Sequence, residues 1–120
     1  MWNIPSDKIL KKIPRLYETE NVEAKEKKIY LHFFVAGSDW YIAEYDGKDT
    51  FFGFACLNRW KDLAEWGYIS FKELKELRVE QPIIFNDKPE VIFLQVECEA
   101  DWKVKKAKDI QLIRECQGWD

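Results

Sequence analysis

The sequence predicts an α+β fold in which a curved, mainly antiparallel sheet of five or six strands carries short N-terminal, middle and C-terminal helices. Segments rich in β-branched and aromatic residues follow one another closely from residue 29 onward, and turns containing Gly and Asp separate them. Helical signals flank these segments at both ends. With 120 residues, of which 47% are hydrophobic and 16% aromatic, the chain has the length and the material for a single domain over residues 1–120.

A short helix is expected near the N-terminal end. Ser6 is a suitable N-cap, the helix extends through Lys12, and Pro14 ends it. Residues 15–28 mix acidic and basic side chains without sustained periodicity. We therefore predict a surface connection over that segment.

Three antiparallel strands are predicted next, over residues 29–35, 40–45 and 51–57. Residues 36–39 and 46–49 provide the turns between them, because Gly tolerates positive φ and Asp hydrogen-bonds its local backbone. This order favours a meander.

The middle helix follows a fourth strand, which is predicted over residues 65–69. Ser70 and Glu73 form a capping box, in which each side chain bonds the backbone of the other. The helix is therefore expected to begin at this point and to cover residues 71–77.

The last third of the chain is predicted to complete the sheet. Residues 79–85 fit a short edge strand interrupted by Pro82, and residues 91–98 fit a clearer strand. Apolar residues at helical spacing predict a final helix over residues 108–116, packed on the sheet. The side chains predicted to be buried in the core are Phe33, Ile42, Phe54, Ile69 and Leu74.

Charge and cysteine pattern limit the classes of function. Nineteen basic against twenty-two acidic residues give a net charge of −3, which disfavours nonspecific coating of duplex nucleic acid. Three widely spaced cysteines without a C-x-x-C pair indicate reduced thiols. No apolar stretch is long enough to span a bilayer, so we expect a cytoplasmic protein without a membrane partner. No phosphate loop, dinucleotide fingerprint or zinc-protease motif occurs, and no cofactor or metal is predicted.

Four polar residues are the candidates for catalysis. Alternation places His32, the only histidine, on an aromatic strand face, and the acidic candidates are Asp39, Glu44 and Glu65. If the four converged, they would supply an acid and a base for hydrolysis, or bind a divalent metal. A structural hydrogen-bond network would use the same residues. In either case His32 is expected to bond a carboxylate or a backbone group, because an unpaired polar group among rings is costly.

A binding surface is the other use of these residues. Either helices cover both apolar faces of the sheet, or one aromatic face is open to a partner. Residues 102–108 alternate apolar groups with lysines, as a phosphate-binding patch or a solvated edge strand would. The residues predicted to bind a partner are Tyr17, Glu18, Trp40, Trp66, Trp102, Lys103, Lys105 and Lys106.

Several short motifs occur in a fixed order along the first two thirds of the chain. They are PRLYETE at 14–20, HFF at 32–34 leading to DWYIAEYD at 39–46, FGF at 52–54 and EWGY at 65–68. Together they resemble a family of small uncharacterised proteins, a domain of unknown function common on bacterial and archaeal plasmids, phages and integrated elements. The match covers roughly residues 13–80, and residues 81–101 fall outside it, which predicts an insertion. The family has no assigned activity, so the resemblance implies kinship and a mobile-element setting only.

The sequence therefore predicts a non-enzymatic binding protein. We expect a mobile-element accessory or anti-defence factor that engages a protein partner, with nucleic acid as the other candidate partner. The alternative is a small hydrolase or nuclease that uses His32 with nearby carboxylates.

Overall fold

The computed structural model describes all of residues 1–120 and confirms an α+β fold with an antiparallel sheet. The helices are α1 (Asp7–Leu10), α2 (Phe71–Glu76) and α3 (Gln111–Gln117), with 3-10 turns η1 (Ala24–Glu26), η2 (Lys61–Leu63) and η3 (Ala107–Asp109). The strands are β1 (Lys28–Ile29), β2 (Leu31–Val35), β3 (Ser38–Tyr45), β4 (Thr50–Cys56), β5 (Glu65–Ser70), β6 (Arg78–Phe85), β7 (Lys88–Gln95), β8 (Glu97–Cys98) and β9 (Lys105–Lys106).

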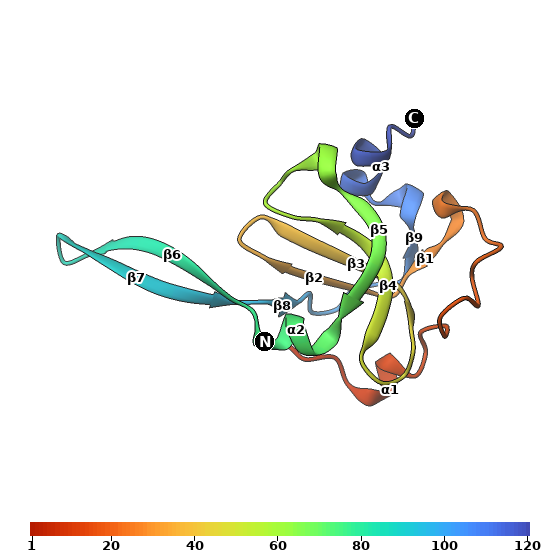
Figure 1. Cartoon of the computed structure of the whole chain (residues 1–120), viewed down its shortest axis with the longest axis horizontal. Helices are drawn as coiled ribbons and strands as arrows, with labels where there is room; N and C mark the ends of the chain where they lie inside the picture. Colours follow the sequence, from red (N-terminus) through yellow and green to blue (C-terminus); the bar gives the residue numbers. More distant parts are fainter.

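Five strands form the main sheet in the order β5-β4-β3-β2-β8, with every pair antiparallel (Figure 1). The predicted meander of β2 to β5 is confirmed. The β2–β3 turn uses Ala36 and Gly37, both with positive φ, which matches the twist of the flanking strands. Trp2 bridges to Glu97 and covers the outer edge of β8.

Both faces of this sheet are packed against other elements. Of the two alternatives, the one in which both apolar faces are covered is therefore correct. One buried cluster includes Leu10 of α1 and Leu74 of α2, and the other includes Ile29 of β1 and Ile113 of α3. Helices and turns accordingly lie on both sides of the sheet in Figure 1. The five side chains predicted for the core are all buried: Phe33, Ile42, Phe54, Ile69 and Leu74.

Helix ends differ from the prediction by a few residues. The first helix stops at Leu10 instead of Lys12, because its last turn tightens and the backbone N–H of Lys12 bonds the carbonyl of Ile9. The last helix begins at Gln111, since the preceding residues form η3. Ser70 is the N-cap as predicted, since its hydroxyl accepts a hydrogen bond from the N–H of Glu73. The return bond of a capping box, from the Ser70 N–H to the Glu73 side chain, is not formed.

Strands β6 and β7 do not join the main sheet, contrary to the prediction. They pair only with each other and form a hairpin, here called the arm (residues 78–95), that projects from the body (Figure 1). Asn86 and Asp87 form its two-residue turn, both at positive φ. The radius of gyration is 15.4 Å, against about 13.6 Å for a compact domain of this length.

No helix of the structure has the length and apolar character needed to cross a membrane.

Candidate binding surfaces and the His32 cluster

His32 lies between two carboxylates, which confirms that it has a polar partner. Its Nε2 is 2.7 Å from Oδ1 of Asp39, and its Nδ1 is 2.8 Å from Oε1 of Glu99. Both ring nitrogens of His32 therefore face a carboxylate oxygen. We call these three residues the His32 cluster.

Aromatic side chains surround the His32 ring. Tyr41 stacks on it at 4.5 Å between ring centroids, and Phe34 and Trp102 lie at 5.4 and 5.5 Å. Burial raises the pKa of the Tyr41 hydroxyl, and the charges of Asp39 and Glu99 raise it further. The cluster is therefore a histidine between two carboxylates that is enclosed on one side by rings.

Glu99 is the residue of this cluster that the sequence analysis missed. It is separated from His32 by 67 positions and reaches the ring because β8 pairs with β2. The backbone N–H of Glu99 also bonds the carbonyl of His32, at 2.8 Å. Only the pairing of β8 with β2 reveals this partner.

Glu44 does not belong to the His32 cluster. It is 4% exposed and accepts hydrogen bonds from the backbone N–H groups of Tyr17 and Thr19, at 2.9 and 3.1 Å, and from the Thr19 hydroxyl. The ammonium of Lys27 donates to the carbonyl and hydroxyl of Thr19. Glu44 thus anchors the loop of residues 15–20 to the sheet, which is a structural role.

The other acidic candidates also lie apart from His32. Glu65 is exposed at the start of β5, and Glu18 accepts a hydrogen bond from the backbone N–H of Arg15. Tyr17, beside Glu18, places its hydroxyl 3.0 Å from that of Tyr68. No group of three or more His, Cys, Asp or Glu side chains is placed to hold a metal ion.

The predicted tryptophans have partners within the chain. Trp40 is buried in the core, so its ring is not open to the partner that the sequence predicted it to bind. The indole N–H of Trp66 donates to Gln117, and that of Trp102 donates to the carbonyl of Ile29. Both rings are half-buried and serve packing.

The basic segment is partly neutralised by Glu26. Lys106 and Lys108 lie 2.7 and 2.9 Å from its carboxylate, and these hydrogen bonds lower the pKa of Glu26 to about 2. Lys105 lies over the Trp102 ring, 4.5 Å from its centroid, and Lys103 is exposed. Residues 102–108 contain the short strand β9, which pairs with β1. Of the two interpretations of this segment, the structure therefore agrees with an edge strand.

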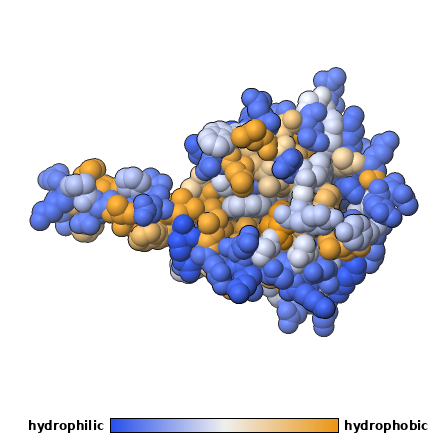
Figure 2. All heavy atoms as spheres, viewed as in Figure 1, coloured by the Kyte–Doolittle hydropathy of each residue, from blue (hydrophilic) through white to orange (hydrophobic).

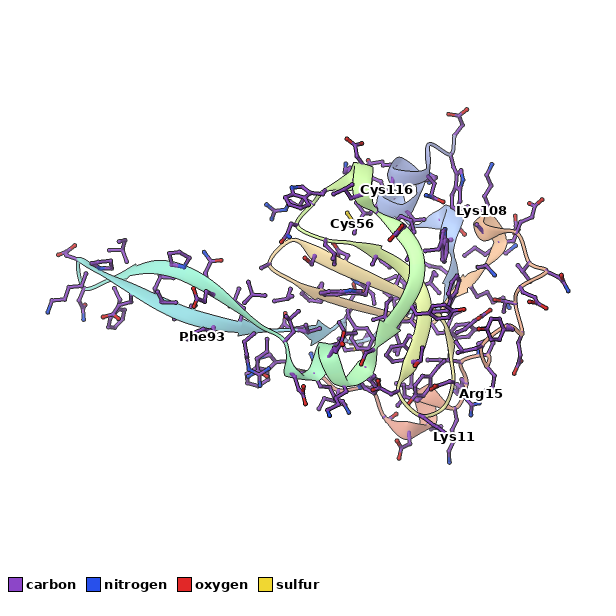
Figure 3. The ribbon with its side chains drawn as sticks, viewed as in Figure 1. Lys11, Arg15, Cys56, Phe93, Lys108 and Cys116 are labelled. Atoms are coloured by element: carbon purple, nitrogen blue, oxygen red, sulfur yellow. The ribbon has the colours of Figure 1, made fainter.

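The arm carries a group of exposed apolar side chains that no other element covers. The register pairs Ile84 with Pro89 and Pro82 with Val91, so alternate positions share one face. We define the arm face as the five apolar residues Pro82, Ile84, Pro89, Val91 and Phe93, which share this side of the hairpin with Glu80. Ile84 is 74% exposed and Phe93 is 61% exposed, and Figure 2 shows apolar atoms along the arm and at its base. Figure 3 labels Phe93 on the arm.

The sequence contained a signal for this surface. Asn86 and Asp87 between two apolar strands are typical of a two-residue hairpin turn. Alternation from that turn would have placed the five apolar residues on one face. The prediction placed the second strand only from residue 91 and both strands in the main sheet, whereas β7 begins at Lys88 and pairs only with β6.

A second apolar surface lies on the body. A groove of about 520 Å³, here called the N-terminal groove, is lined by eight apolar residues among fourteen. Its walls include Ile4, Ile9, Leu31, Trp102 and Val104. Its volume is within the range of sites that bind small ligands or side chains.

No protein-family model matches the chain, and neither the curated proteins nor the solved structures give a match.

Proposed function

We propose that the protein is a binding module that docks onto another protein through its arm. The observation that carries this proposal is the arm face, which exposes five apolar residues on a hairpin that nothing covers. A two-stranded hairpin is marginally stable in water, and exposed apolar patches of this kind mark interaction sites. A partner that covers the arm face would stabilise both the complex and the hairpin.

The charge of the arm favours a protein partner over nucleic acid. Arg78 and Lys88 are outnumbered by Glu80, Asp87 and Glu90, which leaves the arm at −1. A ribbon that binds phosphates needs a basic surplus. The basic segment near β9 also has two of its lysines bound to Glu26.

The resemblance to mobile-element proteins supplies the proposed setting. In that setting the protein is an accessory or anti-defence factor in the host cytoplasm. The three cysteines are free thiols, as a reducing compartment would keep them.

The hydrolase or nuclease alternative has one supporting observation, the contact of His32 with Asp39. The geometry does not favour catalysis beyond that contact, because Asp39 and Glu99 each contact one of the two ring nitrogens of His32. Neither nitrogen is then left to take a proton from a substrate or from water. We therefore interpret the cluster as structural.

An arm-dependent capture experiment tests the proposal. The tagged protein and a variant with Ile84→Ser and Phe93→Ser are each incubated with host extract that also contains the untagged chain. Both side chains are exposed, so the body is expected to fold unchanged. We expect the wild type to retain a protein that the arm variant loses.

The matched control is Leu63→Ser, which removes an equally exposed apolar side chain from η2 on the body. This variant should retain the same protein as the wild type. Equal retention by the arm variant and the wild type would contradict a docking role for the arm.

A further inference from the structure

We propose that the free edge of the main sheet is a second binding site, which takes an extended peptide segment of another protein as an added strand. This edge is the outer side of β5, residues 65–70, and is here called the β5 edge. The central side chain of the added strand is a large aromatic group that covers Gly67. The site is separate from the arm and goes beyond the proposed docking function.

The hydrogen-bond pattern leaves the backbone groups of two residues in β5 without a partner. The N–H of Phe71 bonds the carbonyl of Asp49, and this bonded pair continues the register of β5 with β4. Because bonded and non-bonded pairs alternate, Gly67 bonds β4, whereas Trp66 and Tyr68 direct their N–H and C=O groups away from the sheet. No backbone group of a turn or loop bonds them either. An extended chain has donors and acceptors at the same spacing, so it would satisfy all of these groups.

The other long edges of the structure are protected against such pairing. Trp2 donates to the carbonyl of residue 96 and accepts from the N–H of residue 98, which covers the outer edge of β8. In the arm, pairs alternate from a bonded pair next to the turn, so Pro82 and Pro89 place a nitrogen without a proton on each edge. The β5 edge has no Pro, Lys or bulge, and its one charged residue, Glu65, is at its start. Only this long edge thus lacks the devices that discourage an added strand.

Gly67, at the centre of β5, has no reason within the chain to be glycine. Its φ lies outside the left-handed region, and a Cβ atom there would meet nothing within 4 Å. Its partner on β4 is Gly53, so no side chain of that strand covers it. Glycine weakens a strand and often marks the close approach of another molecule. Opposite Gly67 an added strand would form a non-bonded pair, in which side chains lie closest, so a large ring fits over the glycine.

Aromatic rings lie on the opposite face of the same edge. Tyr68 is 60% exposed, and its hydroxyl is 3.0 Å from that of Tyr17, which is 59% exposed. Trp66 is half-buried and stacks with Phe52. The two residues that flank the central one of an added strand point to this face, where apolar side chains would pack on the rings. The expected segment therefore has an aromatic residue between two apolar ones.

A second copy of β5 does not supply this strand. In antiparallel pairing of two such edges, positions that bond their own sheet face one another. Gly67 would then lie opposite Glu65, Gly67 or Ile69 of the other copy, none of which is aromatic. The β5 edge therefore fits a segment of a different protein.

Selection from a phage-displayed library of random linear peptides tests the inference, with the full wild-type chain as target. Peptides of about nine residues are long enough to form one strand. We expect the enriched peptides to carry an aromatic residue with an apolar residue on each side. When the most enriched peptide is added to the isotope-labelled chain, the N–H groups of Trp66 and Tyr68 should exchange with solvent at least about tenfold more slowly.

Variants of the β5 edge separate backbone pairing from contact with a ring. Tyr68→Pro and Tyr68→Thr both remove the ring, but only proline removes the outward N–H, so Tyr68→Pro should bind the peptide at least about tenfold more weakly than Tyr68→Thr. Gly67→Val fills the space reserved for the partner's ring. This variant should be at least as resistant to urea as the wild type and yet bind at least about tenfold more weakly. The arm variant, Ile84→Ser with Phe93→Ser, should bind like the wild type.

Peptides that bind Tyr68→Pro and Gly67→Val as tightly as they bind the wild type would overturn the inference, as would a library that enriches no peptide. Unchanged exchange at Trp66 and Tyr68 on binding would do the same. Enriched peptides that bind the β5 variants but not the arm variant would occupy the arm, which would overturn the β5 site and support the proposed docking function. Peptides lost only by the β5 variants would support the β5 site, and capture from host extract would still decide the role of the arm.

Discussion

The carboxylate of Glu44 accepts a hydrogen bond from the backbone N–H of Tyr17, with nitrogen and Oε1 2.9 Å apart. Tyr17 has a φ of 71°, a left-handed conformation that a bulky residue rarely adopts. The second carboxylate oxygen accepts from Thr19, so one buried side chain holds three donors of the 15–20 loop. Two of the sequence motifs, PRLYETE at 14–20 and DWYIAEYD at 39–46, thus meet at this carboxylate.

Replacing Glu44 by Gln tests this anchor. An amide retains one oxygen, and its NH₂ group would face an N–H donor of the loop, so we expect a loss of about 1–3 kcal/mol of unfolding free energy. Urea denaturation measures the loss, and hydrogen exchange should show faster opening of residues 15–20. The control is Glu65→Gln, at an exposed site, which should leave both measurements unchanged.

The position of Glu44 shows what alternation along a strand cannot predict. Regular alternation along the strand would place Glu44 on the same face as Trp40 and Ile42. The ladder between β3 and β4 shifts between Ile42 and Glu44, leaving Ala43 as an extra residue. This bulge moves Glu44 to the opposite face, where the 15–20 loop covers it. A single inserted position reverses every later assignment of face.

Replacing His32 tests the His32 cluster. In His32→Ala, Asp39 and Glu99 lose their shared donor and face each other, so we expect a loss of about 1.5–3 kcal/mol. A double-mutant cycle with Glu99→Gln separates the pairing from other effects. Glu99→Gln should destabilise the wild type more than the His32→Ala background. Equal effects in both backgrounds would show that the two side chains do not interact.

Long-range pairing limited the prediction of this cluster and of the arm. The rings around His32 implied that it needs a polar partner, but nothing local could identify Glu99, 67 positions away. In the same way, residues 79–85 and 91–95 were correctly assigned to strands from their β-branched content, although β7 begins earlier, at Lys88. Their pairing with each other and not with the sheet depends on the turn at Asn86 and on the links at Leu77 and Val96.

The raised pKa values of the Cys98 and Cys116 thiols predict that the free energy of unfolding falls at high pH. Burial raises the pKa of Cys98 to about 11, and burial together with Cys56 raises that of Cys116 to about 11. Figure 3 shows Cys56 and Cys116 close together. The unfolded state releases these protons near pH 9, so both contributions are complete below pH 9 and are lost between about pH 9 and 11.

The variant Cys98→Ala combined with Cys116→Ala should show a shallower fall in unfolding free energy across that range. Chemical denaturation at a series of pH values measures the slope. Native alkylation at pH 8 should also be slow, because the thiolate is the reactive form. Rapid labelling of Cys98 in the folded protein would contradict the raised pKa.

The two strand glycines Gly53 and Gly67 provide a matched test of the β3–β4 bulge. They pair with each other across β4 and β5, and neither has positive φ. A Cβ atom at Gly53 would lie 2.0 Å from the carbonyl oxygen of Tyr41, whereas one at Gly67 would meet nothing within 4 Å. The backbone of β3 approaches β4 this closely beside the extra residue Ala43, so only glycine fits at position 53.

We therefore expect Gly53→Ala to cost at least about 3 kcal/mol of unfolding free energy, since the atom it meets is backbone and cannot rotate away. Gly67→Ala should be neutral or stabilising by about 0.4–1 kcal/mol, because it only reduces the freedom of the unfolded chain. Urea denaturation of the two variants side by side gives the comparison. Because the same chemical change is made at two paired positions, equal effects would mean that β3 does not approach Gly53 as described, and the bulge that carries Glu44 to the 15–20 loop would have to be abandoned.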